Sequence, residues 1–452
     1  MDRQGILGDM TPVEGQQPAG SAADGIAGAP RLRRAVRDQV EMHCAALDEL
    51  VPDDHPVRTI WQYVEQLDLS PLTQPIKAVQ GQRGRDATDP QILLALWLWA
   101  TIDGVGSARR LDALCQRDLL YRWVCGGVSV NYHLLSDFRT AQVEFLDRLL
   151  TESVASLMRE GLVDLNRVAQ DGMRVRASAG SDTFRRRETL EECRAKAQQQ
   201  VEVLKQELQQ DSSQGTRRHR AARQRATRER QQRVQEALAH AQELAARREA
   251  RKKGDGSEAR ASTTDPEARR MKFPGGGFHP GYNVQLATDT KSGIIAGADV
   301  TNSGSDGGLM APMVEQVSER YGMTPAEWLV DGGFATKHDI EQAAARGTKP
   351  YAPVKEQAEK RAKGQDPFAP RPGDSPAVAE WRQRMGTDEA KEIYKERAST
   401  AEWANAQLRN HNLRLLLVRG LKKVKAVLLW FVLAHNVLRM ATLRAAATPA
   451  AA

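Results

Sequence analysis

The chain has 452 residues, enough for two or three domains with a sizeable core, and 27% of its residues are charged. Its four cysteines form no CxxC pair and have no His neighbour at zinc spacing, which favours a reducing cytosol over a disulfide framework. A formal net charge of +7 favours a polyanionic partner, foremost nucleic acid. The longest apolar run, Ala426–Ala434, is too short to span a bilayer, so we expect no membrane association.

Residues 1–36 are rich in Gly, Ala and Pro and predict a flexible tail, and residues 37–161 predict a helical domain. Asp89 and Pro90 have the character of an N-cap and first helical residue, and the apolar helix that follows ends at Gly104. This helix is apolar on nearly every side, so we expect it at the centre of the domain.

Two amphipathic helices are expected next, at Ala108–Tyr121 and Val143–Arg159, with Asn131–Thr140 as part of the connection between them. Several arginines accompany this succession of short helices, so the domain could be a helix-turn-helix reader of DNA. A small helical bundle with a solvated basic face fits the pattern equally well.

The segment Leu162–Ala177 alternates apolar and polar residues, which predicts a strand leading into Asp171 and then an irregular or extended continuation. Residues 185–260 change to a helix-forming composition with 20 Lys and Arg against 12 Asp and Glu. A thin apolar stripe predicts two helices joined near Asp211–Gly215, a basic hairpin inserted into the second domain. We expect its basic face along a phosphate backbone, with Arg217, Arg218 and Arg225 as candidates; a solvated charged helix pair is the alternative.

The next part of the chain predicts an α/β unit with a mixed sheet. Lys253–Pro274 is expected to be a linker, and Tyr282–Asp289 with Ile294–Thr301 a β-hairpin. A helix is expected at Asp306–Tyr321, with Asp306 as its N-cap rather than a metal ligand.

A short apolar strand is predicted at Glu327–Asp331, which places Asp331 where the strand gives way to Gly332 and Gly333. A helix at Lys337–Arg346 and a strand at Lys349–Val354 should follow, and then a polar, Pro-rich loop at Glu356–Gly386.

The chain is expected to return to helix at Thr387–Val418, which carries Glu402, and at Leu421–Ala445, which begins with Lys422; residues 446–452 predict a second tail. Asp171, Asp331 and Glu402 therefore stand out as two strand-borne acids and one helical acid. Oxygen ligands suit Mg²⁺ or Mn²⁺, and two such ions about 3.5–4 Å apart can clamp both oxygens of a phosphoryl displacement.

The sequence resembles bacterial insertion-sequence transposases of the DDE class over most of Val51–Arg439. The matching pieces are VPDDHPVR, QDGMRVRASAGSD, MKFPGGGFHPGYNVQLATD, VTNSGSD, VDGGF and the signature Tyr394-x2-Arg397-x4-Glu402-x6-Arg409. This signature departs from the family pattern in carrying Arg409 in place of Lys and in having four residues, not three, before Glu402.

The resemblance implies an N-terminal helical DNA-binding domain and, over residues 162–445, an RNase H-like catalytic core interrupted by the basic hairpin. In such a core the strands of Asp171 and Asp331 are neighbours, and these residues with Glu402 would bind two Mg²⁺ or Mn²⁺ ions. The longer gap makes Glu396 the alternative acid. Phosphate or DNA contacts would come from basic residues and one tyrosine, namely Tyr394, Arg397, Arg409 and Lys422.

The reaction implied by the resemblance is nicking at the ends of an insertion element, followed by joining of the 3′-OH ends to target DNA. The partner would be double-stranded DNA, bound by a homodimer or higher oligomer in a synaptic complex at the bacterial nucleoid in the cytoplasm. Two other functions stay open: an inactive, sequence-specific DNA-binding repressor derived from a transposase, and a metal-dependent nuclease without strand transfer.

Overall fold

The computed structural model describes residues 44–79, 81, 83, 86–210, 217–250 and 255–447, together with residues 35, 37, 38, 40 and 42. Side chains at 208–210 and 217–218 are outside this description. Most of the expected N-terminal tail and residues 448–452 also lie outside it. All the elements below belong to one unit, Ala46–Ala452, and the residues before it form a separate unit.

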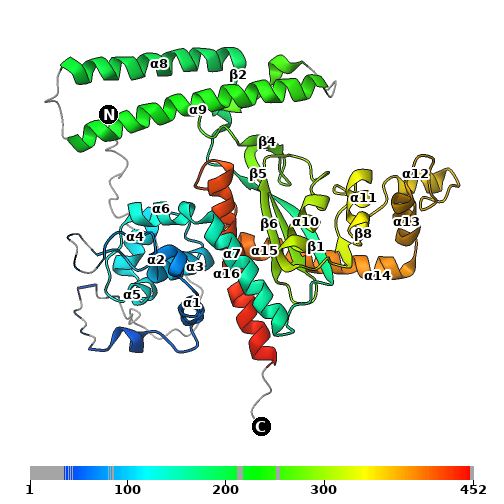
Figure 1. The fold of residues 1–452 in the computed structure, drawn as a ribbon, viewed down its shortest axis with the longest axis horizontal. Helices are drawn as coiled ribbons and strands as arrows, with labels where there is room; N and C mark the ends of the chain where they lie inside the picture. Colours follow the sequence, from blue (N-terminus) through cyan, green and yellow to red (C-terminus); the bar gives the residue numbers. More distant parts are fainter. Residues whose placement is uncertain are drawn as a thin grey trace, which may run out of the picture. The chain divides into compact units, whose positions relative to one another are not determined.

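The N-terminal part of this unit is helical, as expected (Figure 1). Its helices are α1 (Pro56–Glu65), α2 (Ser70–Thr73), α3 (Pro90–Ile102), α4 (Ala108–Arg117), α5 (Leu119–Cys125), α6 (Tyr132–Ala141) and α7 (Val143–Arg159). The predicted cap of α3 is confirmed, because the Asp89 carboxylate accepts a hydrogen bond from the Gln91 N–H at 2.8 Å. Nearly every residue of α3 is buried, which confirms its central position.

Two expectations for this region were wrong. The helix predicted at Ala108–Tyr121 is divided at Asp118, whose side chain accepts from the Leu120 N–H and starts α5. The expected connection at Asn131–Thr140 is mostly helix α6, because the Asn131 side chain caps it and its apolar residues are buried at helical spacing.

The second part of the unit is built on a mixed sheet with the strand order β4-β5-β1-β7-β8, and β6 also pairs with β5. The strands are β1 (Arg167–Arg176), β4 (Arg269–Lys272), β5 (Phe278–Asp289), β6 (Ile295–Thr301), β7 (Glu327–Leu329) and β8 (Lys349–Tyr351). β5 is antiparallel to both of its neighbours β1 and β6, whereas β7 runs parallel to β1, and β8 runs parallel to β7. The predicted hairpin and mixed sheet are confirmed, and β1 continues past Asp171 as a regular strand.

The basic helical hairpin interrupts the chain between β1 and β5. It consists of α8 (Arg187–Gln210) and α9 (Arg217–Ala250), and its base is closed by the antiparallel pair β2 (Phe184–Arg186) and β3 (Arg260–Ser262). A small separate core, which includes Leu190, Leu238 and Ala261, holds the base together. The expected linker at Lys253–Pro274 was wrong in part, because it contains both β3 and β4.

Helices surround the later strands: α10 (Met310–Tyr321), α11 (Lys337–Ala345), α12 (Gln357–Ala362), α13 (Pro376–Met385), α14 (Asp388–Arg397) and α15 (Trp403–Asn410). The polar segment Glu356–Gly386, expected to be a loop, contains α12 and α13. The helix expected at Thr387–Val418 ends at Asn410, and residues 411–418 then run beside β1, where Leu415 bridges Arg176.

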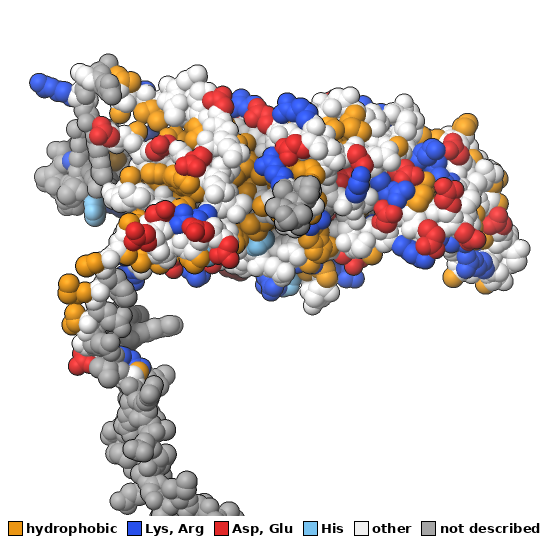
Figure 2. Space-filling view, turned by 90° about the horizontal axis from the view of Figure 1, so that it is seen from below, with side chains coloured by type: hydrophobic (Ala, Val, Ile, Leu, Met, Phe, Trp, Pro, Cys, Tyr) orange, Lys and Arg blue, Asp and Glu red, His pale blue; other side chains and the backbone are white. Residues whose placement is uncertain are grey.

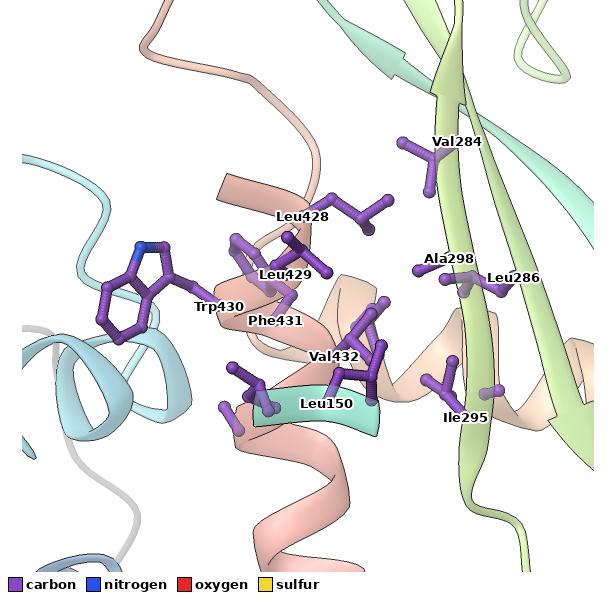
Figure 3. Packing of buried hydrophobic residues seen from close by; sticks show 14 of the residues in the cluster. Leu150, Val284, Leu286, Ile295, Ala298, Leu428, Leu429, Trp430, Phe431 and Val432 are labelled. Atoms are coloured by element: carbon purple, nitrogen blue, oxygen red, sulfur yellow. The ribbon is translucent and has the colours of Figure 1, made fainter. Parts of the chain in front are cut away.

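The last helix, α16 (Leu421–Ala447), lies at the centre of the hydrophobic core. Figure 3 shows Leu428 and Val432 directed toward the sheet residues Val284 and Ile295, while Trp430 points the other way, toward the helical region. There its indole N–H donates to the Arg139 carbonyl at 2.9 Å. Although α16 is long and apolar enough to cross a membrane, 72% of that stretch is buried inside the protein, as in the core helix of a soluble protein.

Candidate active site

Two neighbouring parallel strands place Asp171 and Asp331 side by side. The ladder pairs Arg167 with Glu327, and each aspartate lies four residues after its member of this pair. The pairing ends at Ala169 and Leu329, so each aspartate lies two residues beyond it. The charge of Asp331 raises the pKa of Asp171, which indicates that the two carboxylates repel each other.

The Asp171 carboxylate is half-buried and held from two sides. Its Oδ2 accepts from Asn405 Nδ2 at 2.8 Å, and Arg397 Nη2 lies 3.4 Å from its Oδ1. Burial raises the pKa of Asp171, and the Arg397 guanidinium and the Gly172 N–H oppose this rise. The negative charges of Asp331 and Asp306 raise the pKa further, which indicates that three carboxylates lie near one another.

The turn after β7 orients Asp331. Its Oδ1 accepts from the Gly333 N–H at 2.6 Å, and a Cβ at residue 333 would lie only 2.9 Å from the same oxygen. Gly333 is therefore needed for the close approach of the backbone to the carboxylate. Phe334, which directly follows Gly333, is fully buried and anchors the turn.

Glu402 lies at the end of a π-helical turn, Ala398–Glu402, that joins α14 to α15. A π turn accommodates one residue more than an α turn, so it absorbs the extra residue between Arg397 and Glu402 and leaves the flanking helices in register. The side chain of Glu402 is 65% exposed, and Arg397 Nη1 lies 3.7 Å from the Oε1 atom of Glu402. Arg397 thus stands between Asp171 and Glu402.

The alternative acid, Glu396, is engaged elsewhere. Its Oε1 lies 2.5 Å from Arg167 Nη1, and the same guanidinium binds Glu327. Glu396 therefore neutralises an arginine at the start of β1, four residues before Asp171 along the strand.

Tyr394 lies close to the same carboxylates. Burial raises the pKa of its hydroxyl, Arg397 opposes the rise, and Asp331, Asp171 and Glu402 add to it. Arg409 is exposed at the end of α15.

Two polar residues of this region were missed or misread from the sequence. Asn405 was missed; its position three residues after Glu402 on one helix was the signal that could have found it. Asp306, expected to cap the following helix, does not do so, since α10 begins at Met310 after the N-cap Leu309. The buried Asp339 carboxylate instead accepts from the Gly308 and Ala311 N–H groups.

Asp306 faces the sheet instead. It accepts hydrogen bonds from Asn283 at 2.7 Å and Gln285 at 3.2 Å and forms an ion pair with Arg174 at 2.9 Å. A Cβ at Gly172 would lie 2.5 Å from an Asp306 oxygen, so glycine is required beside Asp171 for this approach.

Carboxylate and amide oxygens are the donors that hard divalent cations prefer. Asn405 adds a buried Oδ1 with no hydrogen-bond partner, beside the Asp171 carboxylate that its amide group holds. These donors fit a divalent cation at the Asp171 and Asp331 end of the site. Among the described residues no group of three or more His, Cys, Asp or Glu is arranged to hold a metal ion, because Glu402 is separated from Asp171 by Arg397.

The predicted DNA contacts on the hairpin and α16 lie apart from the carboxylates. Arg225 is exposed on α9, the side chains of Arg217 and Arg218 fall outside the described residues, and Lys422 Nζ is paired with Glu144 at 2.8 Å. Figure 2 shows a face on which basic and acidic side chains are interspersed. By contrast, α9 carries ten Arg against four Glu, so positive charge is concentrated on this helix.

Comparisons with known protein families give two matches. A family model described as "Transposase domain (DUF772)" matches residues 45–141, and one described as "Transposase DDE domain" matches residues 255–438. The second match includes Asp331 and Glu402, whereas Asp171 lies between the matched segments. Searches of curated proteins and of solved structures gave no significant match.

The sheet agrees with these matches. Three antiparallel strands followed by two strands parallel to the first, with helices around them, form an RNase H-like core. The helical region precedes this core in the chain, and the chain belongs to the insertion-sequence transposases of the DDE class.

Proposed function

We propose that this transposase nicks DNA at the ends of its insertion element and joins the freed 3′-OH ends to target DNA, with Asp171, Asp331 and Glu402 as the metal-binding carboxylates. The observation that carries the proposal is the parallel pairing of β1 with β7, which ends at Ala169 and Leu329, two residues before Asp171 and Asp331 respectively. Repulsion between two carboxylates favours a cation between them.

Transposases of this class in general use divalent metal ions, and Mg²⁺ or Mn²⁺, as two ions, suits the oxygen donors here. When bound, such ions activate the attacking oxygen and stabilise the leaving oxygen of a phosphoryl displacement. Asp171 and Asp331 would hold them from the sheet, and Glu402 would join from the exposed end of the π turn. Asn405 would keep Asp171 oriented through the hydrogen bond to its Oδ2.

Arg397 is suited to a second task. Its guanidinium lies 3.4 Å from Asp171 and 3.7 Å from Glu402, distances that indicate weak pairing. We infer that it turns to a phosphate of the DNA near the cleaved bond, because guanidinium groups bind phosphate in a bidentate manner. The exposed Arg409, and Tyr394 near Arg397, would contact the same strand of DNA.

DNA binding follows from the class, and double-stranded element ends and target DNA are the partners we propose. The basic helix α9 would run along the phosphate backbone. We also propose that the helical domain over residues 37–161 binds DNA. The synaptic complex would contain a homodimer or a higher oligomer of the chain. The class implies a soluble cytosolic protein, and association with the nucleoid would follow from its DNA binding.

One observation favours a second candidate, a DNA-binding repressor that does not cleave. The three predicted ligands do not converge among the described residues, since Arg397 separates Glu402 from Asp171. A chain fixed in this arrangement would bind DNA without metal chemistry.

Incubation of the purified protein with duplexes of its element ends separates the candidates. A transposase gives 3′-OH nicks in Mg²⁺ but not in EDTA, and then joined products with a target duplex. Nicks without joined products would identify a nuclease, and specific end binding without metal-dependent nicks would identify a repressor.

A further inference from the structure

A cavity of about 310 Å³ lies in the helical domain, far along the chain from the carboxylates. It is formed by the start of α4, by α6 and by the segment that precedes α16. Its lining includes Trp97, Ser107, Arg109, Tyr132, Asp137 and Arg139. A volume of this size is at the lower end of those that hold ligands, about 300–1,000 Å³.

Arg139 is a buried cation without a counter-ion. Its side chain stacks on the Trp97 ring, 4.6 Å from the ring centroid, and Nη1 donates to the Gly106 carbonyl at 2.5 Å. The residue is only 6% exposed, Nε is buried with no hydrogen-bond partner, and no described carboxylate forms an ion pair with it. Burial lowers the pKa of Arg139 to about 10. An uncompensated buried charge is costly, so this cavity is complementary to an anion.

The N-terminus of α4 borders the same cavity. Ser107 caps this ten-residue helix by accepting from the Arg110 N–H, and Ser107 and Arg109 both line the cavity. The first N–H groups and the dipole of a helix attract anions. At the rim, the exposed Arg109 lies over the Tyr132 ring at 5.1 Å. Asp137 is an exposed acid on the wall and opposes an anion.

The cavity is linked by backbone to the catalytic helix. After α15, His411 Nδ1 lies 2.9 Å from the Ile102 carbonyl, and Asn412 donates to the Gly104 carbonyl at 3.1 Å. The same segment bridges β1 at Leu415 and then supplies Leu417 to the cavity wall. A group held in the cavity therefore contacts the segment that follows α15, the helix that begins directly after Glu402.

A second cavity of about 540 Å³ adjoins the first and reaches α9. The two share wall residues, including Asp137 and Leu417. The wall of the second cavity includes Arg233 of α9 and Arg419 but also the acids Glu229, Glu236, Asp265 and Glu267, so the first cavity is the better site for an anion.

We propose that the first cavity binds one backbone phosphate of the element-end duplex, with Arg139 as its buried donor, the α4 N-terminus as its cap and Arg109 at its rim. The proposal rests on the DNA-binding part of the proposed function and not on cleavage. It makes this phosphate the point at which the DNA end is fixed relative to the carboxylates.

The test uses the full chain in EDTA and a set of end duplexes, each with one neutral methylphosphonate linkage in place of a phosphate. For the wild type, one position should weaken binding about tenfold or more, because a charge-assisted hydrogen bond is lost. Arg139→Gln should bind the unmodified duplex correspondingly weakly and lose nothing further at that position. For Arg139→Gln, the slope of log affinity against log salt concentration should be shallower than that of the wild type by about 0.9.

Circular dichroism and thermal melting will show whether Arg139→Gln folds. If it does not, two variants at exposed positions, for which opposite changes in affinity are expected, still test the proposal. Arg109→Ala should weaken binding, and Asp137→Asn should strengthen it, and both effects should shrink at the same methylphosphonate position. Equal losses for the wild type and all variants at every position would overturn the proposal.

Free phosphate has the same chemistry as a phosphate of the DNA backbone, and an experiment with inorganic phosphate distinguishes the two as occupants of the cavity. If millimolar phosphate raises the melting temperature of the wild type but not of Arg139→Gln, and no methylphosphonate position is coupled to Arg139, the cavity binds free phosphate and the DNA assignment is wrong. Because every arm is a binding measurement without metal, a failure of the separate nicking assay in Mg²⁺ would count against the catalytic proposal and not against this one.

Discussion

At the scale of single residues, the site depends on which acids are free to bind a cation. Asp171 and Asp331 each lie two residues beyond the paired part of β1 and β7, whereas Glu396 forms an ion pair with Arg167 at 2.5 Å. Glu402 is paired only loosely, by Arg397 at 3.7 Å. The difference between the two glutamates makes Glu402 the candidate that the geometry supports.

Glu402→Gln should lower the rate of end nicking by about 10³-fold, because loss of one metal ligand removes several kcal/mol of transition-state stabilisation. Glu396→Gln is the matched control, since the amide can still accept from Arg167, and its nicking rate should stay within about threefold of the wild type. Gel assays of nicked duplex measure both. The reverse ranking would assign the third acid to Glu396.

His435 gives the stability of the fold a dependence on pH. It is buried, its Nε2 lies 3.0 Å from the Gly293 carbonyl, and its ring packs against Trp403. Burial lowers its pKa to about 4, below the unfolded value of about 6.5. Between these values only the unfolded state binds the proton, so stability falls as pH falls through this window.

Between pH 7 and pH 5 this residue should cost the wild type about 2 kcal/mol of unfolding free energy. His435→Gln cannot titrate but can still donate to Gly293, so its loss over the same range should be smaller by that amount. Urea denaturation at the two pH values measures the difference. Equal losses in both proteins would show that His435 does not titrate in this window.

At the scale of elements, the π turn between α14 and α15 explains why the signature of this chain has one residue too many. A residue removed from the π turn should convert it to an α turn and leave both helices in place. The sequence alone shows the extra residue but not where the helix accommodates it.

Deletion of the exposed Ser399 should therefore preserve helix content, and its nicking rate should stay within about tenfold of the wild type. Deletion of Ala406, in the regular part of α15, is the control: it should rotate Glu402 and Asn405 by about 100° relative to the buried Leu408 and abolish nicking. Circular dichroism and the nicking assay report on both. Loss of activity on deleting Ser399 would mean that the π turn itself is required.

Local patterns predicted elements well where a cap or an alternation was strong. Asp89 with Pro90 predicted the start of α3, and the apolar run before Asp331 predicted β7, although this strand ends at Leu329 and not at Asp331 as expected. Contacts between distant residues could not be predicted. β3 and β4 are short and basic and form because β2 and β5 pair with them. Asn405 reaches Asp171 across 234 positions of sequence, and Asp306 lost its expected cap role to Asp339.

At the scale of the whole molecule, α16 connects the helical region to the sheet, and α9 concentrates positive charge. The helical region and the core share this buried helix, with Trp430 on one side and Val432 on the other. DNA held by one region is thereby positioned relative to the other.

If α9 follows the phosphate backbone, Arg225→Ala should weaken end binding and make the salt dependence shallower by about 0.9. Lys422→Ala is the comparison, because Lys422 is paired with Glu144 and should change the slope less. Fluorescence anisotropy at several salt concentrations measures both. A slope unchanged by Arg225→Ala would remove this part of α9 from the DNA interface.

The central claim is that Asp171 and Asp331 together hold the metal ions of a nicking reaction, and Asp331→Asn tests it most directly. Binding of the element-end duplex in EDTA and nicking in Mg²⁺ should be measured on the same preparation of the variant. We predict binding equal to that of the wild type and nicking reduced by at least about 10³-fold. Undiminished nicking by Asp331→Asn would contradict the account.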